Sequence, residues 1–220
     1  MIILDLGNGG VLHNDNETIR KTIDSVAEID TKRECILKFQ LFISIQNKVQ
    51  LRRDVFHRAW EYATSLGFHC TSSAFDYDSV QFLSLYEVPF VKISNHPHLK
   101  KERIVNDCRK SFISYSAQQF PLENVLLSVS DAEEFNRFTG REVALLCCVS
   151  EYPAKAEDYE KRFTADQLQT GLSDHTVGLD LYKKYRPKIF EKHYVLDEVT
   201  DKPRPYCMGP RELKNLLKEK

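Results

Sequence analysis

Residues 171–197, GLSDHTVGLDLYKKYRPKIFEKHYVLD, contain the pattern from which the fold can be inferred. The stretch opens with a short run that predicts a strand at 170–173. An amphipathic segment at 179–185 predicts a helix, and an apolar run at 188–195 predicts a second strand. A strand, a helix and a strand in this order form the unit from which parallel sheets are built.

The second strand of this unit carries an unusual set of side chains on one face. Alternation with a period of two places Ile189, Glu191 and His193 on that face. A carboxylate and an imidazole on a buried strand are costly unless they are paired or bind something. Because His175 follows the neighbouring strand, it could join Glu191 and His193 in a metal site.

The same alternation of strands and helices extends over the whole chain. Further strands are expected at 2–7, 35–41, 68–73, 89–94, 111–116 and 142–149. Further helices are expected at 17–27, 51–66, 78–86, 99–108, 122–132, 159–168 and 210–217. The apolar run within 122–132 would also fit a strand, but its apolar residues recur at helical spacing, which favours a helix.

Eight predicted strands alternate with eight predicted helices, which implies parallel strands with right-handed crossovers. Eight such units predict a closed (β/α)8 TIM barrel, an α/β fold, as a single compact domain over residues 1–220. A doubly wound open sheet is the alternative. However, Gly7-Asn8-Gly9-Gly10 does not match the GxGxxG pattern of a nucleotide-binding first turn.

Composition excludes several classes of function. A formal net charge of −1 gives no electrostatic case for binding nucleic acid or an anionic membrane surface. No apolar run reaches the roughly 18 residues of a spanning helix, and the first residues lack the features of a signal peptide. The six cysteines show no CxxC spacing, which favours reduced thiols and a cytoplasmic location.

The active sites of such barrels lie at the C-terminal ends of the strands, so polar residues should gather there. The predicted strands are accompanied by Asp5, Lys38, Gln40, Ser72, Ser73, Lys92, Ser94, Ser114, Ser116, Ser150, Ser173, His175, Glu191 and His193. Two lysines among several hydroxyls are typical of a phosphate or carboxylate site. Two histidines on the adjacent last strands could bind a divalent metal through neutral imidazoles.

These residues also have simpler interpretations. A lone lysine at a strand end commonly reaches solvent, and a lone histidine is more often structural than a ligand. Ser173, Asp174 and His175 do not predict a hydrolytic triad, since contiguous residues on one strand cannot converge. The site hypothesis is favoured because all the candidates share one end of one barrel.

Six segments, in order along the chain, carry a resemblance to a known family. They are LKFQ (37–40), SSAFD (72–76), VPFVKIS (88–94), ALLCCVSEYPA (144–154), GLSDHT (171–176) and EKHYVLD (191–197). With these motifs the chain resembles the N-terminal barrel of the sialic acid synthase family, which makes N-acetylneuraminic, pseudaminic and legionaminic acids. The resemblance runs from about Asp5 to Leu217, so the chain is expected to lack the family's C-terminal antifreeze-like domain.

The resemblance implies an enzyme that condenses phosphoenolpyruvate with an N-acylated amino sugar, releasing phosphate and forming a nonulosonic acid. His175 and His193 would hold Mn²⁺ or Mg²⁺, with Glu191 beside them as a further catalytic residue. Phosphoenolpyruvate would contact Lys38, Ser73, Lys92, Ser116 and Ser173. The sugar would face Asp5, Gln40, Ser150 and Tyr152. A homodimer is one assembly that the resemblance allows.

Several positions differ from the family pattern. Asn95-His96-Pro97 stands where the family has an acidic residue regarded as catalytic, and Cys147 stands in place of a histidine. Residues 202–205 replace a late acidic motif, which leaves Asp201 as a nearby candidate. These differences support a second hypothesis, a catalytically degenerate barrel that serves as a binding or assembly protein.

Overall fold

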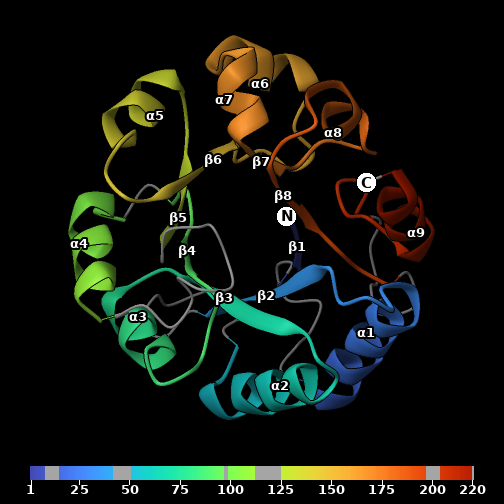
Figure 1. The fold of residues 1–220 in the computed structure, drawn as a ribbon. Helices are drawn as coiled ribbons and strands as arrows, with labels where there is room; N and C mark the ends of the chain where they lie inside the picture. The colour runs from blue at the N-terminus through green and yellow to red at the C-terminus, as the bar shows by residue number, and fades with distance from the viewer. Residues whose placement is uncertain (8–14, 42–50, 97–98, 112–124, 197–203, 220) are drawn as a thin grey trace.

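The computed structural model describes residues 1–7, 15–41, 51–96, 99–111, 125–196 and 204–219. Within these ranges eight parallel strands close into a barrel in the order β1 to β8, with β1 paired to β8. The helices surround the barrel on its outside (Figure 1). The predicted (β/α)8 TIM barrel is therefore confirmed.

The strands are Ile2–Asp5 (β1), Cys35–Leu41 (β2), His69–Ala74 (β3), Val91–Ile93 (β4), Val125–Val129 (β5), Ala144–Cys148 (β6), Gly171–Asp174 (β7) and Ile189–His193 (β8). The helices are Asn16–Ile29 (α1), Arg53–Ser65 (α2), Tyr77–Leu83 (α3), Lys101–Ser111 (α4), Ala132–Phe138 (α5), Ala156–Arg162 (α6), Ala165–Thr170 (α7), Asp180–Tyr185 (α8) and Pro210–Glu219 (α9). None of these described helices has the length and apolar character needed to cross a membrane.

The fifth strand lies later in the chain than the sequence predicts. The predicted helix at 122–132 is wrong, because β5 occupies Val125–Val129 and pairs with β4 and β6. Every residue of β5 is buried, so it lacks the polar alternation that separates a strand from a helix. The predicted strand at 111–116 is wrong at Ser111, which belongs to α4; the rest of that segment, including Ser116, lies outside the described residues.

The helices around β6 also differ from the prediction. Asp131 accepts a hydrogen bond from the backbone N–H of Glu134 and so begins α5. The single helix predicted at 159–168 is two helices, because α6 ends at Arg162 and Thr164 begins α7 with a capping box to Gln167.

The interior of the barrel changes from apolar to polar along the strands. A buried apolar cluster closes the N-terminal end, formed by Ile3, Ile36, Phe90, Leu126, Leu146 and Ile189. Inward-facing side chains recur every second residue, so the next inward position on each of these strands is two residues further on. These positions hold Asp5, Lys38, Lys92, Ser128, Cys148 and Glu191, all buried, which we call the polar layer.

The opposite faces of the strands pack against the helices in a second, larger core. Phe39 of β2 meets Phe56 of α2 with ring centroids 6.2 Å apart, and Phe56 meets Phe82 of α3 at 5.8 Å. Apolar packing on this side holds the strands in place while their inner faces carry charge.

Candidate active site

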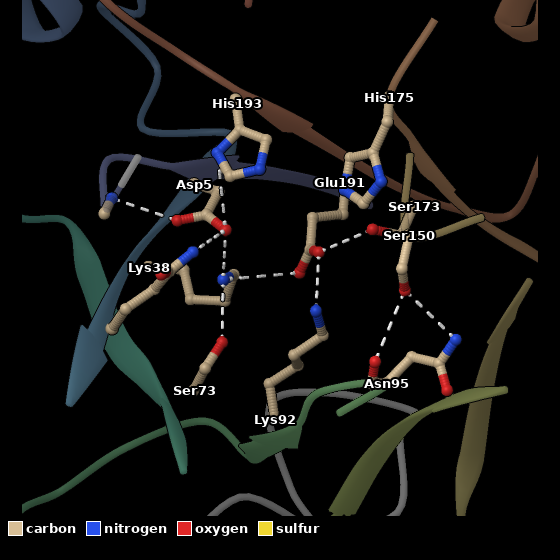
Figure 2. Close-up of polar contacts among 12 residues, drawn as sticks. Asp5, Lys38, Ser73, Lys92, Asn95, Ser150, Ser173, His175, Glu191 and His193 are labelled. Carbon is tan, nitrogen blue, oxygen red and sulfur yellow. Dashed lines mark hydrogen bonds and ion pairs between the residues drawn. The ribbon is translucent and has the colours of Figure 1, made fainter. Parts of the chain in front are cut away.

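Lys38 and Asp5 form an ion pair on one side of the polar layer. Lys38 Nζ donates to Asp5 Oδ2 at 2.6 Å and to Ser73 Oγ at 2.8 Å (Figure 2). The two charged residues meet because they are register partners in β1 and β2. The Lys38 side chain is fully buried, so its ammonium group depends on these partners in place of water.

Lys92 of β4 makes the second ion pair, with Glu191 of β8. Lys92 Nζ and the Ser173 hydroxyl each donate to Glu191 Oε1 at 2.8 Å. Glu191 Oε2 lies 3.8 Å from Lys38 Nζ, so this carboxylate contacts both cations. Burial alone would raise the pKa of Glu191, but Lys38 and Lys92 hold it well below its usual range. Burial would lower the pKa of Lys92, but the Glu191 carboxylate raises it.

Asp5 connects this charged network to the histidines. Its Oδ2 accepts a hydrogen bond from Gln40 Nε2, and its Oδ1 accepts one from the Gly7 backbone N–H, each at 3.0 Å. His193 Nδ1 lies 3.6 Å from Asp5 Oδ2, beyond hydrogen-bond length. His193 Nδ1 makes no hydrogen bond to any described residue. A proton on His193 Nδ1 would face the Asp5 carboxylate, at a distance too long for a hydrogen bond.

His175 and His193 lie side by side, with ring centroids 5.4 Å apart. His175 Nδ1 is 2.6 Å from the Val149 carbonyl oxygen, which assigns the proton to Nδ1 and leaves Nε2 with a lone pair. Burial, reinforced by His193, lowers the pKa of His175 to about 3. Burial also lowers the pKa of His193, although Asp5 opposes this. Both imidazoles are therefore neutral at neutral pH.

The histidine pair fits the requirements of a divalent metal. Neutral imidazoles are metal ligands, and a ligand histidine usually donates its other N–H to a carbonyl or carboxylate. The Val149 carbonyl is that acceptor for His175, and for His193 the Asp5 carboxylate lies nearby, with Oδ2 3.6 Å from Nδ1. In the described ranges no group of three or more His, Cys, Asp or Glu side chains is placed to hold a metal. The two imidazoles by themselves are fewer ligands than the four of a closed structural site.

Two tyrosines cover the histidines at the mouth of the barrel. The Tyr152 ring lies 4.3 Å from that of His175 and 5.2 Å from that of Tyr206, centroid to centroid. Tyr206 in turn lies 5.6 Å from His193. The Tyr152 side of this wall is open, since 53% of the residue is exposed.

Ser150 lies apart from the charged network, at the rim. It is exposed, accepts a hydrogen bond from Asn95 Nδ2 at 3.2 Å, and donates one to the Asn95 carbonyl at 3.3 Å. Lys101 Nζ, bound to Glu134, donates to Asn95 Oδ1 at 2.8 Å. Asn95, which stands near the position of the family's acid, is therefore held against Ser150 (Figure 2).

The structure thus brings together most of the candidate residues predicted from the sequence. The grouped residues are Asp5, Lys38, Gln40, Ser73, Lys92, Tyr152, Ser173, His175, Glu191 and His193. Ser116 and Asp201 lie outside the described residues, and Ser150 sits at the rim.

Three residues of the site were missed by the sequence reasoning. Ser128 belongs to the polar layer, and its buried hydroxyl makes no hydrogen bond to any described residue. The helical spacing of the apolar residues around it predicts a helix there, which hides its inward position. Cys148 was assigned to an apolar strand, although the alternation from Leu146 would have pointed it inward. Tyr206 does not directly follow a strand, so no alternation of side chains predicts that it belongs to the site.

Fold and site together define a class: a (β/α)8 barrel whose C-terminal end combines buried lysine–carboxylate pairs with two neutral histidines. The NeuB family matches residues 15–220, and the chain belongs to this family. This confirms the resemblance read from the motifs.

Two curated relatives are similar to most of this chain. Over 174 residues it is 29% identical to N,N'-diacetyllegionaminic acid synthase of Legionella pneumophila, covering 71% of this chain and 47% of that protein. Over 184 residues it is 28% identical to N-acetylneuraminate-9-phosphate synthase of Drosophila melanogaster, covering 76% and 47%. The chain spans about half the length of these relatives.

Solved structures share the same barrel. N-acetylneuraminic acid (sialic acid) synthetase from Leptospira borgpetersenii, in complex with citrate, has a TM-score of 0.76 and 22% identity, covering 99% of this chain and 81% of that one. A putative spore coat polysaccharide biosynthesis protein E from Chromobacterium violaceum has a TM-score of 0.75 and 14% identity, covering 99% and 72%. At these identities the likeness supports the fold alone.

Proposed function

We propose that this chain is the barrel of a synthase that condenses phosphoenolpyruvate and one water molecule with an N-acylated amino sugar, forming a nonulosonic acid and releasing inorganic phosphate. The observation that carries the proposal is the position of the histidine pair directly beside the charged network, at 3.6 Å between His193 Nδ1 and Asp5 Oδ2. The names of the curated relatives, synthases of legionaminic acid and N-acetylneuraminate 9-phosphate, support the same reaction.

Lys92 and Lys38 would hold the anionic groups of phosphoenolpyruvate. Each ammonium group already contacts a carboxylate, so the substrate would compete with Glu191 for Lys92. Phosphoenolpyruvate brings more negative charge and more acceptor oxygens than one carboxylate, which favours it in that competition. The hydroxyls of Ser73 and Ser173 already donate or accept in the network and would add hydrogen bonds to the substrate.

His175 and His193 would hold a divalent cation, Mn²⁺ or Mg²⁺, which as a Lewis acid would polarise the aldehyde of the acceptor. The protein's part is to keep both imidazoles neutral and oriented. Burial keeps His175 neutral, the Val149 carbonyl orients its ring, and Asp5 faces His193.

The amino sugar would bind at the mouth, between the histidines and the tyrosine wall. The exposed face of Tyr152 can pack against the apolar face of a sugar ring. Gln40 and Asp5 at one side and Ser150 at the rim offer hydrogen-bonding groups to its hydroxyls and N-acyl group. Alignment of the two substrates in one site would contribute to the rate enhancement.

The test is an assay of phosphate release from phosphoenolpyruvate with Mn²⁺ and a panel of N-acylated amino sugars, free and phosphorylated. Release is expected only when acceptor and metal are both present. Lys92→Ala should abolish it, whereas Lys184→Ala, at a side chain that is 59% exposed, should not. Absence of acceptor-dependent release across the panel would count against the synthase.

A further inference from the structure

Asp174 and Lys192 form a buried ion pair on the outer side of β7 and β8. Lys192 Nζ lies 3.1 Å from Asp174 Oδ2, and the two side chains are 1% and 0% exposed. They are direct register partners, and they form the last pair in the β7–β8 ladder. Because strand residues alternate, they lie on the opposite side of these strands from Ser173 and Glu191. The proposed reaction makes no use of them.

The pair holds the backbone on both sides of His175. Asp174 Oδ1 accepts hydrogen bonds from the Thr176 backbone N–H at 2.8 Å and from its hydroxyl at 2.7 Å. Lys192 Nζ donates to the Thr176 carbonyl at 2.9 Å. A residue of β8 is therefore bound to the residue that follows His175.

The hydrogen bond from Lys192 to the Thr176 carbonyl lies just beyond the end of the β7–β8 ladder. The β7–β8 register stops at Asp174, one residue before His175, so the backbone ladder does not position the histidine relative to β8. His175 donates its backbone N–H to Tyr159 Oη at 3.0 Å, and its carbonyl accepts from the Ala154 N–H at 2.9 Å. These contacts fix His175 relative to the β6–α6 side, and Lys192 fixes it relative to the strand that carries His193.

Stability alone does not explain two fully buried charges at this place. Replacing a buried ion pair by well-packed apolar residues is often neutral or stabilising. We propose that Asp174 and Lys192 are positioning residues whose ion pair sets the separation of the His175 and His193 rings. The effect on metal affinity rests on the proposed function, but the effect on ring separation does not.

The test uses the double variant Asp174→Asn with Lys192→Met. Asparagine can still accept the Thr176 hydrogen bonds and methionine fills the lysine stem's space, so only the bridge between the strands is removed. Calorimetry should show Mn²⁺ affinity weaker by at least about tenfold, as is typical for residues behind a metal ligand. A crystal structure should show a ring-centroid separation that departs from 5.4 Å.

The matched control is Tyr194→Phe. It removes a partly buried hydrogen bond between Tyr194 Oη and Ser25 Oγ, 2.6 Å long, on the same outer side of the barrel, without touching residues 174–176. This variant should keep the wild-type Mn²⁺ affinity and ring separation.

Three other results would count against one of the two proposals. A double variant with wild-type Mn²⁺ affinity and ring separation would overturn the positioning role. So would a double variant that does not fold, because the pair would then serve the barrel itself. Wild-type protein that binds no Mn²⁺ would contradict the proposed function instead, and the ring separation would then decide the positioning role alone.

Discussion

Lys92 and Glu191 meet across the interior of the barrel: β4 and β8 are not neighbouring strands, yet Lys92 Nζ lies 2.8 Å from Glu191 Oε1. This contact joins strands on opposite sides of the barrel, next to the apolar cluster that closes its N-terminal end. The network also contains Lys38 and Asp5, so two cations and two anions are buried together. Their mutual neutralisation explains how the fold accommodates four charges that water does not solvate.

Glu191→Gln should destabilise the barrel by about 3–5 kcal/mol, because it leaves the buried Lys92 without its anion. Urea denaturation at neutral pH would measure the change. The control is Glu61→Gln, at an exposed i,i+4 pair with His57, which should change stability by less than about 0.5 kcal/mol. Equal effects of the two substitutions would contradict a central role for the network.

Acid should weaken the fold through His175. Its pKa falls from 6.5 to about 3 on folding, so between these values the unfolded chain binds a proton that the folded barrel does not. The stability due to the neutral imidazole is complete above pH 6.5 and is lost toward pH 3, by up to about 1.4 kcal/mol per pH unit. Glu191, whose pKa is also lowered, adds to the loss below pH 4.5.

Urea midpoints measured between pH 6.5 and pH 4.5 separate the contribution of the two buried histidines from that of Glu191, and the variant His175→Gln identifies the part due to His175. The variant His175→Gln should show a flatter dependence on pH than wild type in this window. His57→Gln, at a half-exposed side chain, should follow the wild-type slope. Parallel curves for all three proteins would show that another group controls acid stability.

The alternation of side chains in β8 could be predicted from the sequence because polar residues interrupt an apolar run. Ile189, Glu191 and His193 do share the inner face. The same reasoning failed for β5, because VLLSV is buried on both sides and the apolar residues in and around it recur at helical spacing, which favours a helix. That error concealed Ser128. Strands that carry charged residues are thus easier to place than β5, whose one polar residue is the uncharged Ser128.

Partners that face each other across the barrel were harder to infer. The sequence indicates that Lys38 and Lys92 gather at one end, but not that Glu191 contacts both, because this depends on how the strands close. The Asp174–Lys192 pair was also not anticipated, since outward-facing charges on buried strands have no periodic signature. Closure of the barrel creates the contacts of Glu191, whereas the register of β7 with β8 creates the Asp174–Lys192 pair.

His175→Ala and His193→Ala should each weaken Mn²⁺ binding by more than about 100-fold. Loss of a group that only hydrogen-bonds a metal ligand typically costs about 10–100-fold in affinity, and each of these variants removes a ligand itself. Calorimetry with Mn²⁺ would measure the affinity, and circular dichroism would check that the barrel is retained. His69→Ala is the control, since His69 is exposed at the start of β3. Unchanged affinity in both site variants would place the metal elsewhere.

Phosphoenolpyruvate should raise the thermal unfolding midpoint of the wild-type protein, since binding at 100 times Kd adds about 2.7 kcal/mol of stability. The decisive variant is Lys92→Met with Glu191→Gln, which removes the proposed anion contact while leaving no unpaired charge at this pair. Its shift should be lost, whereas Lys184→Met, at a side chain that is 59% exposed, should keep the wild-type shift. A full shift in the double variant would place the anion away from Lys92. If wild-type protein shows no shift at millimolar phosphoenolpyruvate with Mn²⁺ present, the synthase proposal fails and only the barrel and its family remain.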